Sequence, residues 1–498
     1  MMNRRGQPRL FCLIVGLLCL VAGPVLLSCN GGSSAGSPGG TTNDSGVGAS
    51  GFSSSQPVAC NDGASAPAGH TFYLDPATGS ISNDGSAGSP WSTLQALIEN
   101  NMIETQAYAD LPYDGSNPLV VKNSGAPVKA GDTLVLRNGY HGEFVLLGAY
   151  NKFPITVKAA VGHRPSLSRI HLTAVANWRI QGLVVSPSAA PTYTANTLVA
   201  VTSHNWHGPS SHVVIENCEL YSVADASGWS MDDWNNLACN AVSVSGDCMT
   251  LRDNLCRNVN FGITVSGNSS LVSGNTVENF SGDGMRGLGN DLVFEYNLVK
   301  NCFDVNGNHD DGFQSWSINN DPPRERVVLR GNTFINYDNP GQPFRGTLQG
   351  IGCFDGPYVD WVVENNLVIT DHWHGISLYG AFNSRIVNNT VVDINATSPG
   401  PPWIMVNPHK DGTPSRGCLI RNNIAATFIV TGDTLADHNH QLKASENLFI
   451  DPTAFDYHLR ADAVVLIDQG SDALAPELDL DGVTRPQGGG VDIGAYEY

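Results

Sequence analysis

Basic residues are scarce in this sequence of 498 residues, because 26 Lys and Arg stand against 46 Asp and Glu, for a formal net charge of -20. Nucleic-acid binding needs a basic footprint, so this composition argues against it. The acidic balance equally fails to indicate a polyanionic substrate. An acidic sugar would therefore need local cations, supplied by Arg and Lys side chains or by a bound metal ion.

The sequence also lacks a CxxC pair of the kind that holds zinc. It lacks the longer apolar stripes at helical spacing that helical repeats require. Cysteines are present in numbers that an oxidising compartment would allow to pair, but their pairing cannot be deduced from spacing. The eight that follow Cys29 are Cys60, Cys218, Cys239, Cys248, Cys256, Cys302, Cys353 and Cys418.

The N-terminal segment has the features of an export signal. Three arginines among the first nine residues precede an apolar run over residues 10–27, which is followed by Ser28 and Cys29. The tetrad at residues 26–29 resembles a bacterial lipobox, which implies a lipoprotein signal peptide over residues 1–29 and a lipid on Cys29. The chain would then be held at the bacterial cell envelope by its lipid anchor only, without spanning the membrane. Residues 30–70 are rich in Gly and Ser and are predicted to form a flexible tether.

Short apolar runs that end in asparagine recur through the rest of the chain. Four intervals between these asparagines are 21 to 24 residues long and the other four are 34 to 37, as expected of one repeat unit with loops inserted in half of its copies. This period is typical of a solenoid, and the short β-prone runs predict parallel sheets of stacked coils. Each asparagine amide would satisfy backbone groups of neighbouring coils. The series is Asn217, Asn254, Asn275, Asn297, Asn332, Asn366, Asn389, Asn423 and Asn447.

On this repeat, the chain resembles the pectin-lyase-like superfamily over most of residues 71–450. The resemblance implies an all-β fold, a single-stranded right-handed parallel β-helix. The amphipathic segment from Trp91 to about Met102 is predicted to be the N-terminal capping helix. Residues 451–498 resemble the closing segment of many bacterial secreted β-helices. The period indicates the architecture strongly and the chemistry weakly.

A second pattern consists of a small residue followed by an apolar one, six times in succession. The apolar residue should point inward, and the next residue and the one two beyond it should point outward. The first outward column is Ser243, Thr264, Arg286, Gln314, Gly352 and Ser377. The second is Ser245, Ser266, Leu288, Trp316, Phe354 and Tyr379. With coils ~4.8 Å apart, the three aromatics would cover roughly 10 Å, which suits sugar rings or else an aromatic stack that only stabilises the sheet.

The residues just before the small ones carry the candidate chemistry. They read Asn240, Phe261, Asp283, Asp311, Gln349 and His374. Acidic, amide and imidazole groups would therefore stack at the starts of adjacent strands, where the longer loops emerge. Loops held by a rigid scaffold are the usual place of such sites.

The loop before Asp311 offers alternating oxygen atoms of the kind that Ca²⁺ prefers. It lacks the closing Glu of an EF-hand, and the alternative is a hydrogen-bonded turn. Two adjacent aspartates need a cation or a shared proton to lie close together. The predicted calcium ligands are Asp283, Asp304, Asn306, Asn308, Asp310 and Asp311.

The first candidate function is metal-assisted β-elimination of a uronate-containing polysaccharide. Calcium would bind the uronate carboxylate while Lys410, His374 or Arg345 removes the C5 proton. Arg286 and Arg345 would help to neutralise the carboxylate. These parts resemble those of the calcium-dependent pectate and alginate lyases, and they would equally serve a C5-epimerase.

The second candidate is an inverting glycoside hydrolase. Asp283, the pair Asp310-Asp311, the segment 374–377 and Lys410 resemble, in chain order, the NTD, DD, GHG and RIK motifs of polygalacturonases. The departures are Ser-Gly-Asp at 281–283, Pro-His-Lys at 408–410 and an additional coil bearing Gln349. That coil would move His374 ~4.8 Å away, so hydrolysis ranks second.

The third candidate is a non-catalytic sugar-binding solenoid. The concentration of ionisable groups in successive coils argues against it. In every case the partner is a polysaccharide and the chain is expected to be a monomer. The predicted substrate-binding residues are Arg286, Gln314, Trp316, Gln349, Phe354, Tyr379, His372 and His409.

Overall fold

The computed structural model describes residues 57, 60, 68–317 and 322–498. The predicted signal peptide, the lipidation site Cys29 and most of the predicted tether lie outside the described residues. Within the described ranges, no helix is long and apolar enough to cross a membrane.

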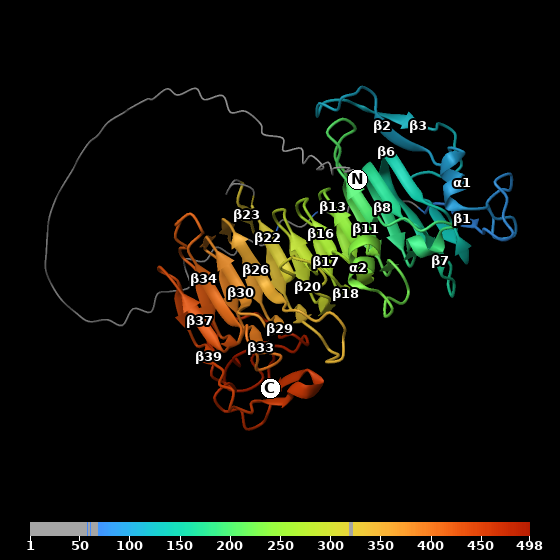
Figure 1. Cartoon of the computed structure of the whole chain (residues 1–498). Helices are drawn as coiled ribbons and strands as arrows, with labels where there is room; N and C mark the ends of the chain where they lie inside the picture. The colour runs from blue at the N-terminus through green and yellow to red at the C-terminus, as the bar shows by residue number, and fades with distance from the viewer. Residues whose placement is uncertain (1–56, 58–59, 61–67, 318–321) are drawn as a thin grey trace, which may run out of the picture. The chain divides into compact units, whose positions relative to one another are not determined.

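From β10 (Thr197–Thr202) onward, each coil carries three short strands, and each strand pairs in parallel with its counterpart in the next coil. Strands β13 (Asn240–Val244), β14 (Thr250–Arg252) and β15 (Leu255–Val259) form one such coil. They pair with β16 (Ile263–Val265), β17 (Leu271–Ser273) and β18 (Thr276–Phe280) of the following coil. This stacking, visible in Figure 1, confirms the predicted right-handed parallel β-helix.

The coils therefore build three ladders of parallel strands. The ladder that carries the candidate site, here called the site sheet, consists of β10 (Thr197–Thr202), β13, β16, β19 (Met285–Gly287), β22 (Asp311–Trp316), β26 (Gln349–Asp355), β30 (His374–Tyr379), β34 (Trp403–Asn407) and β37 (Thr427–Val430). The second consists of β11 (Ser211–Glu216), β14, β17, β20 (Val293–Glu295), β24 (Val328–Arg330), β28 (Val362–Glu364), β32 (Arg385–Val387), β35 (Leu419–Arg421) and β38 (Leu435–Asp437). The third consists of β5 (Gly139–Tyr140), β7 (Pro165–Leu167), β9 (Val184–Val185), β12 (Glu219–Tyr221), β15, β18, β21 (Leu298–Cys302), β25 (Thr333–Ile335), β29 (Leu367–Thr370), β33 (Thr390–Asp393), β36 (Ile424–Ala425) and β39 (His440–Gln441).

The remaining strands begin the stack or extend its edges. The first coils use β1 (Thr71–Leu74), β4 (Thr133–Leu136), β6 (Phe144–Ala159) and β8 (Ile170–Gln181). An antiparallel hairpin of β2 (Thr105–Tyr108) and β3 (Leu119–Lys122) joins them, and a small parallel sheet contains β23 (Arg324–Glu325), β27 (Tyr358–Val359) and β31 (Ala381–Phe382).

The pairing of the site sheet agrees with the register expected from the sequence. Met285 pairs with Phe313, Phe313 with Ile351, and Ile351 with Ile376, and all four side chains are buried in the main core. The first outward column is therefore aligned as predicted. The second is interrupted, because a bulge in β26 places Asp355 rather than Phe354 opposite Trp316.

The asparagine ladder is present, with two corrections. From Asn254 to Asn423, each side-chain Nδ2 donates to the Oδ1 of the next member at 2.9 to 3.0 Å. Asn217 is not a member, since the backbone N–H that donates to Asn254 Oδ1 is that of Cys218. The last member is Asn439 rather than Asn447.

The predicted capping helix is present but shorter than expected. Helix α1 spans Leu94–Glu99, and Thr93 caps it by accepting a hydrogen bond from the Ala96 N–H at 3.1 Å. Trp91 lies before the helix in a parallel bridge to Leu74, so it continues the β-structure instead. The buried Leu94 and Leu97 pack in the main core. A second helix, α2 (Met231–Leu237), lies in the loop before β13.

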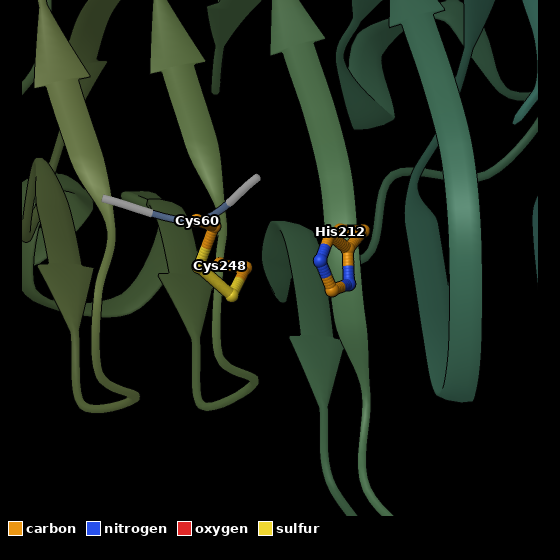
Figure 2. Close-up of side chains that lie close together, drawn as sticks. All are labelled: Cys60, His212 and Cys248. Atoms are coloured by element: carbon orange, nitrogen blue, oxygen red, sulfur yellow. A yellow bond between two sulfur atoms is a disulfide. The ribbon is translucent and has the colours of Figure 1, made fainter. Parts of the chain in front are cut away.

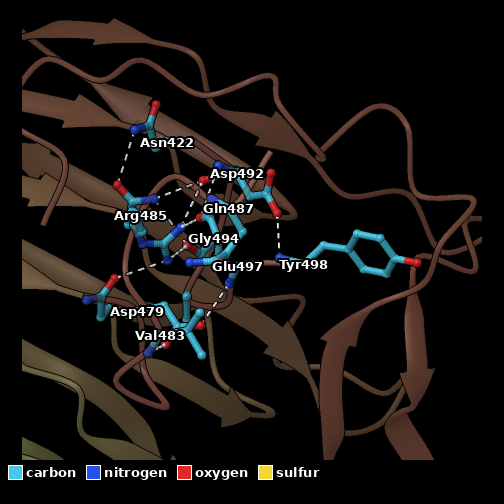
Figure 3. Close-up of polar contacts among 12 residues, drawn as sticks. Asn422, Asp479, Val483, Arg485, Gln487, Asp492, Gly494, Glu497 and Tyr498 are labelled. Carbon is cyan, nitrogen blue, oxygen red and sulfur yellow. Dashed lines mark hydrogen bonds and ion pairs between the residues drawn. The ribbon is translucent and has the colours of Figure 1, made fainter. Parts of the chain in front are cut away.

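Residues 449–498, here called the closing segment, pack on the outer side of the third ladder. The segment contains β40 (Phe449–Asp451), the 3-10 turn η3 (Pro452–Ala454) and β41 (Asp456–Leu459). The Arg485 guanidinium donates to Glu497 at 2.5 Å, and only 1% of either side chain is exposed. Figure 3 shows the network around this pair, including Asn422 and Gly494. Apolar side chains of the closing segment form a second core with side chains of β25, β29, β33 and β36.

Candidate active site

Four predicted site residues stand at the starts of consecutive strands of the site sheet. Asp283 precedes β19, while Asp311, Gln349 and His374 open β22, β26 and β30. The Asp311 N–H donates to Asp283 Oδ1 at 3.0 Å, and Asp311 pairs with Gln349. The parallel register thus brings these side chains side by side at one corner of the coils.

An exposed histidine is held by a buried aspartate at this corner. The Nδ1 atom of His309 lies 3.1 Å from Asp311 Oδ2, and Gln314 Nε2 donates to the same oxygen at 3.0 Å. The Asp311 side chain is 0% exposed, whereas 63% of the His309 side chain is exposed. The second carboxylate oxygen, Oδ1 of Asp311, is buried without a hydrogen-bond partner among the described residues. The buried aspartate is therefore removed from solvent, while the imidazole that it holds is exposed.

The pKa values of both groups of this pair are raised above their ordinary values. Burial raises the pKa of Asp311 to about 7. The hydrogen bond to Asp311 raises the pKa of His309, because the negative carboxylate stabilises the imidazolium form. Since the two groups share the titration, a proton that they bind belongs to the pair, and the exposed imidazole can exchange it with a ligand.

Asp283 is bound to a cation three residues later in the chain, Arg286 of β19. Arg286 Nε donates to Asp283 Oδ2 at 2.5 Å. Burial raises the pKa of Asp283, and the nearby Arg286 opposes this shift. The guanidinium carbon lies 3.6 Å from the centre of the Phe261 ring and 5.7 Å from that of Trp316. The arginine is thus sandwiched between an acid and aromatic faces.

Asp310 faces a different environment from Asp311. Its Oδ2 accepts a hydrogen bond from the Cys302 thiol at 3.4 Å, and burial raises the pKa of Asp310 to about 8. Adjacent residues of an extended chain point to opposite sides, which explains why the two carboxylates do not act as one pair.

A cavity of about 200 Å³ opens in front of the dyad formed by His309 and Asp311. Lys410, on the loop after β34, contributes its ammonium group, which lies 2.9 Å from Asp355 Oδ1. The structure thus places Lys410 beside Asp355 of β26, in the cavity that Trp316 also lines. The lining residues are His309, Gln314, Ser315, Trp316, Gly352, Phe354, Asp355 and Lys410.

Aromatic rings continue from this cavity toward the later coils. The His374 ring lies 4.7 Å from that of Phe354 and 5.1 Å from that of Trp403, between centroids. Tyr379 lies 5.4 Å from Phe354, and Trp373 is 43% exposed. Burial lowers the pKa of His374 to about 4, so this imidazole is neutral at ordinary pH. This group of rings is therefore suited to stacking on sugar rings rather than to proton transfer.

Three further predicted site residues, Arg345, His372 and His409, do not line the cavity. The Arg345 guanidinium lies over the Tyr337 ring at 4.7 Å. His409 is close to the Gly380 backbone and 3.0 Å from Asp411. His372 stacks on His374 with centroids 5.3 Å apart, and burial lowers its pKa.

The six predicted calcium ligands do not converge. Asn306 donates to Asn235 of α2 at 3.0 Å, while Asn306 Oδ1 accepts from the Asn308 N–H at 2.9 Å. The exposed Asp304 lies against Gly346. Among the described residues, one group of three His, Cys, Asp or Glu side chains has its ligand atoms within 4.8 Å of one another, and it is elsewhere in the chain. Among the described residues, the predicted carboxylate ligands therefore do not form a cluster that would hold a calcium ion.

Several residues of the site were not singled out from the sequence. His309 lies within the predicted metal loop without being one of its predicted ligands, and no pattern in the sequence distinguishes Asp355, Trp373 and Trp403. The His-x-Asp spacing of His309 and Asp311 was the available signal, because alternate residues of an extended segment point to the same side.

No protein-family model matches the chain, and a search of curated proteins finds no match. Several solved structures are similar at low identity. A pectate lyase, Pel9A, is 15% identical, with 87% of this chain and 97% of that one covered and a TM-score of 0.44. A rhamnogalacturonan lyase is 15% identical, with 77% and 91% covered and a TM-score of 0.41. The A-module of the Azotobacter vinelandii mannuronan C-5 epimerase AlgE6 is 12% identical, with 62% and 90% covered and a TM-score of 0.38. At these values, the activity has to be argued from the chain's own residues.

Proposed function

We propose that the chain is a carbohydrate-active enzyme that cleaves a uronate-containing polysaccharide by β-elimination in the cavity beside His309. The observation that carries this proposal is the exposed imidazole of His309, fixed by buried Asp311, in a cavity that also contains Lys410. An imidazole that changes protonation near neutral pH and is oriented by a carboxylate is well suited to act as a general base.

The reaction would begin with removal of the C5 proton of a uronate by His309. The electron pair of the C5–H bond forms a C4=C5 double bond, the C4–O bond breaks, and the leaving oxygen takes a proton from water. Because His309 Nδ1 faces Asp311, its Nε2 is the nitrogen that accepts the proton. Asp311 stabilises the imidazolium that results.

Removal of this proton requires that the charge of the uronate carboxylate be neutralised. Lys410 lines the cavity with 56% of its side chain exposed, and its present partner is Asp355. A uronate carboxylate would compete with Asp355 for that ammonium group. Arg286 lies on the neighbouring coil beside Trp316 and supplies a second cation.

Burial disfavours the hydrolytic alternative. Inverting hydrolysis needs one carboxyl group at the glycosidic oxygen and another at the attacking water. The side chains of Asp283 and Asp311 are 4% and 0% exposed, and both are engaged by Arg286 or His309. The residue that contacts a bound sugar is therefore the histidine.

The test is a screen of uronate polysaccharides in which new reducing ends and the ultraviolet absorbance of the C4=C5 double bond are followed together. We expect both signals from the unmodified protein. His309→Gln should lower turnover at least about 100-fold, as expected for loss of a general base. Lys410→Met should raise KM, whereas Arg345→Met, whose guanidinium lies on Tyr337, is the matched cation control.

Each contrary outcome identifies another activity. Reducing ends without absorbance would overturn β-elimination in favour of hydrolysis. An inverted C5 centre without cleavage would indicate an epimerase, and binding without any reaction would indicate a sugar-binding protein. Loss of turnover in EDTA with the fold intact would restore the calcium hypothesis and overturn the role given to Lys410 and Arg286.

A further inference from the structure

One corner of the coils carries a cysteine and a histidine at equivalent positions. Both residues have left-handed backbones, with φ of 54° at His212 and 59° at Cys248. The His212 N–H donates to Asp247 O, and the Cys248 N–H donates to Asn268 O, so each residue makes the same bond to the following coil. Their side chains therefore leave the same corner on consecutive coils, ~4.8 Å apart.

A third ligand comes from a distant part of the sequence. Cys60 forms a disulfide with Cys248, with Cα atoms 5.6 Å apart and a sequence separation of 188. The two sulfurs and a ring nitrogen of His212 all lie within 4.8 Å of one another, and the three side chains are half-buried. Figure 2 shows the imidazole beside the disulfide.

We propose that Cys60, Cys248 and His212 form a metal site for Zn²⁺ when the disulfide is reduced. A dithiol reductant would transfer two electrons and two protons to the disulfide, giving two thiols and the oxidised reductant. Binding of Zn²⁺ would release both thiol protons and join two thiolates and one neutral imidazole to the ion. The disulfide and the metal site are alternative states of the same residues.

The donor set is one that zinc prefers. Two thiolates and an imidazole are typical zinc ligands, and a water completes the tetrahedral shell. Zinc–sulfur bonds of about 2.3 Å and a zinc–nitrogen bond of about 2.0 Å require donors less than about 4 Å apart. The separation of at most 4.8 Å leaves only a small adjustment of side chains. Arg179 and Arg252, both ion-paired with the buried Glu216, line the same cavity of about 330 Å³.

The remaining thiols in the described part of the chain do not compete for this role. They are buried, so they are shielded from both the reductant and the metal ion. These cysteines are Cys218, Cys239, Cys256, Cys302, Cys353 and Cys418.

The site would also keep the N-terminal segment attached to the coils. Cys60 precedes β1, and the disulfide ties it to the turn before β14. Zinc would replace this covalent link by a coordination link, so residue 60 would stay on the same corner in both redox states.

The experiment compares the purified full chain before and after reduction by a dithiol, which is then removed without oxygen. Zinc is titrated against a coloured chelator. We expect one additional Zn²⁺ per chain in the reduced protein, and none in the oxidised protein or in the double variant Cys60→Ser/Cys248→Ser. His212→Ala should weaken the binding at least tenfold, roughly as for loss of one of three ligands. His438→Ala, on the exposed turn after β38, is the matched control.

Two results would overturn the proposal. If the reduced protein binds no more zinc than the double variant, the cysteines do not form a site. If His212→Ala binds as tightly as the unmodified protein, the imidazole is not a ligand. Circular dichroism of each variant, recorded without metal, distinguishes loss of the site from loss of the fold.

Discussion

Gly352 belongs to the first outward column and lies directly against the Asp311 carboxylate. A Cβ atom at residue 352 would lie 2.0 Å from Asp311 Oδ1, whereas ordinary contacts begin at 3.4 Å. Gly352→Ala must therefore displace the carboxylate by about 1.4 Å, since the alternative is to move the strand backbone. A misplacement of about 1 Å near reacting groups costs about 100-fold in rate, so we expect kcat to fall by about that factor. The overpacking should lower the free energy of unfolding by only about 1–3 kcal/mol.

The assay is turnover of the polysaccharide identified in the screen, combined with nuclear magnetic resonance of the histidine side chains. When Asp311 moves away, the pKa of His309 should fall toward its ordinary value, because the hydrogen bond that raises it is lost. The matched control is Gly307→Ala in the loop before His309, where a Cβ atom has nothing within 4 Å. Unchanged turnover and an unchanged His309 titration in Gly352→Ala would show that the dyad is not the reactive group.

Three further predictions follow from pH, the asparagine ladder and the buried ion pair. A general base must lose its proton before it can act, so kcat/KM should rise with pH as His309 titrates. A value of kcat/KM that falls between about pH 6 and about pH 9 would contradict the role of His309. Asn332→Ala removes the side-chain hydrogen bonds to the Phe294 carbonyl and the Asn297 N–H, so the free energy of unfolding in urea should fall by about 2–4 kcal/mol. The control Asn236→Ala, at an exposed residue, should change it very little. Arg485→Met leaves Glu497 buried without its cation and should cost about 3–5 kcal/mol in the same assay, while Arg460→Met at the surface should cost little.

The repeat of the site sheet was predictable because burial and alternation act on every coil. Ile263, Met285 and Phe313 are apolar residues that follow a glycine, and their inward direction fixes the register of both neighbours. The bulge that places Asp355 opposite Trp316 has no such pattern, because it depends on the local geometry of one strand.

The errors in the asparagine ladder have a specific physical cause. Asparagine suits both the ladder position and the left-handed residue just before it. Asn217 has φ of 55° and occupies this second position, which Asn365, Asn388 and Asn422 also occupy in later coils. The residue type alone therefore cannot separate the two positions.

The site was predictable at its strands and not at its loops. Asp283 and Asp311 were placed correctly at the starts of adjacent strands, since the coil register determines these positions. The directions of His309, Asn306 and Lys410 depend on loop conformations that no periodic pattern specifies. For this reason, the sequence indicated calcium ligands where the structure has a histidine held by an aspartate.

The closing segment has a consequence for how the stack of coils opens. Terminal repeats of a solenoid normally fray first, because they have a neighbour on one side only. Asn365, Asn388 and Asn422 belong to three successive coils, and each is hydrogen-bonded to the closing segment. The closing segment therefore fastens these three coils together, so that none of them can separate without breaking its bond to a segment that the other two also hold. The backbone amides of β32 and β35 should consequently exchange with solvent in a single cooperative event, and a nick within residues 471–494 should turn that event into coil-by-coil fraying.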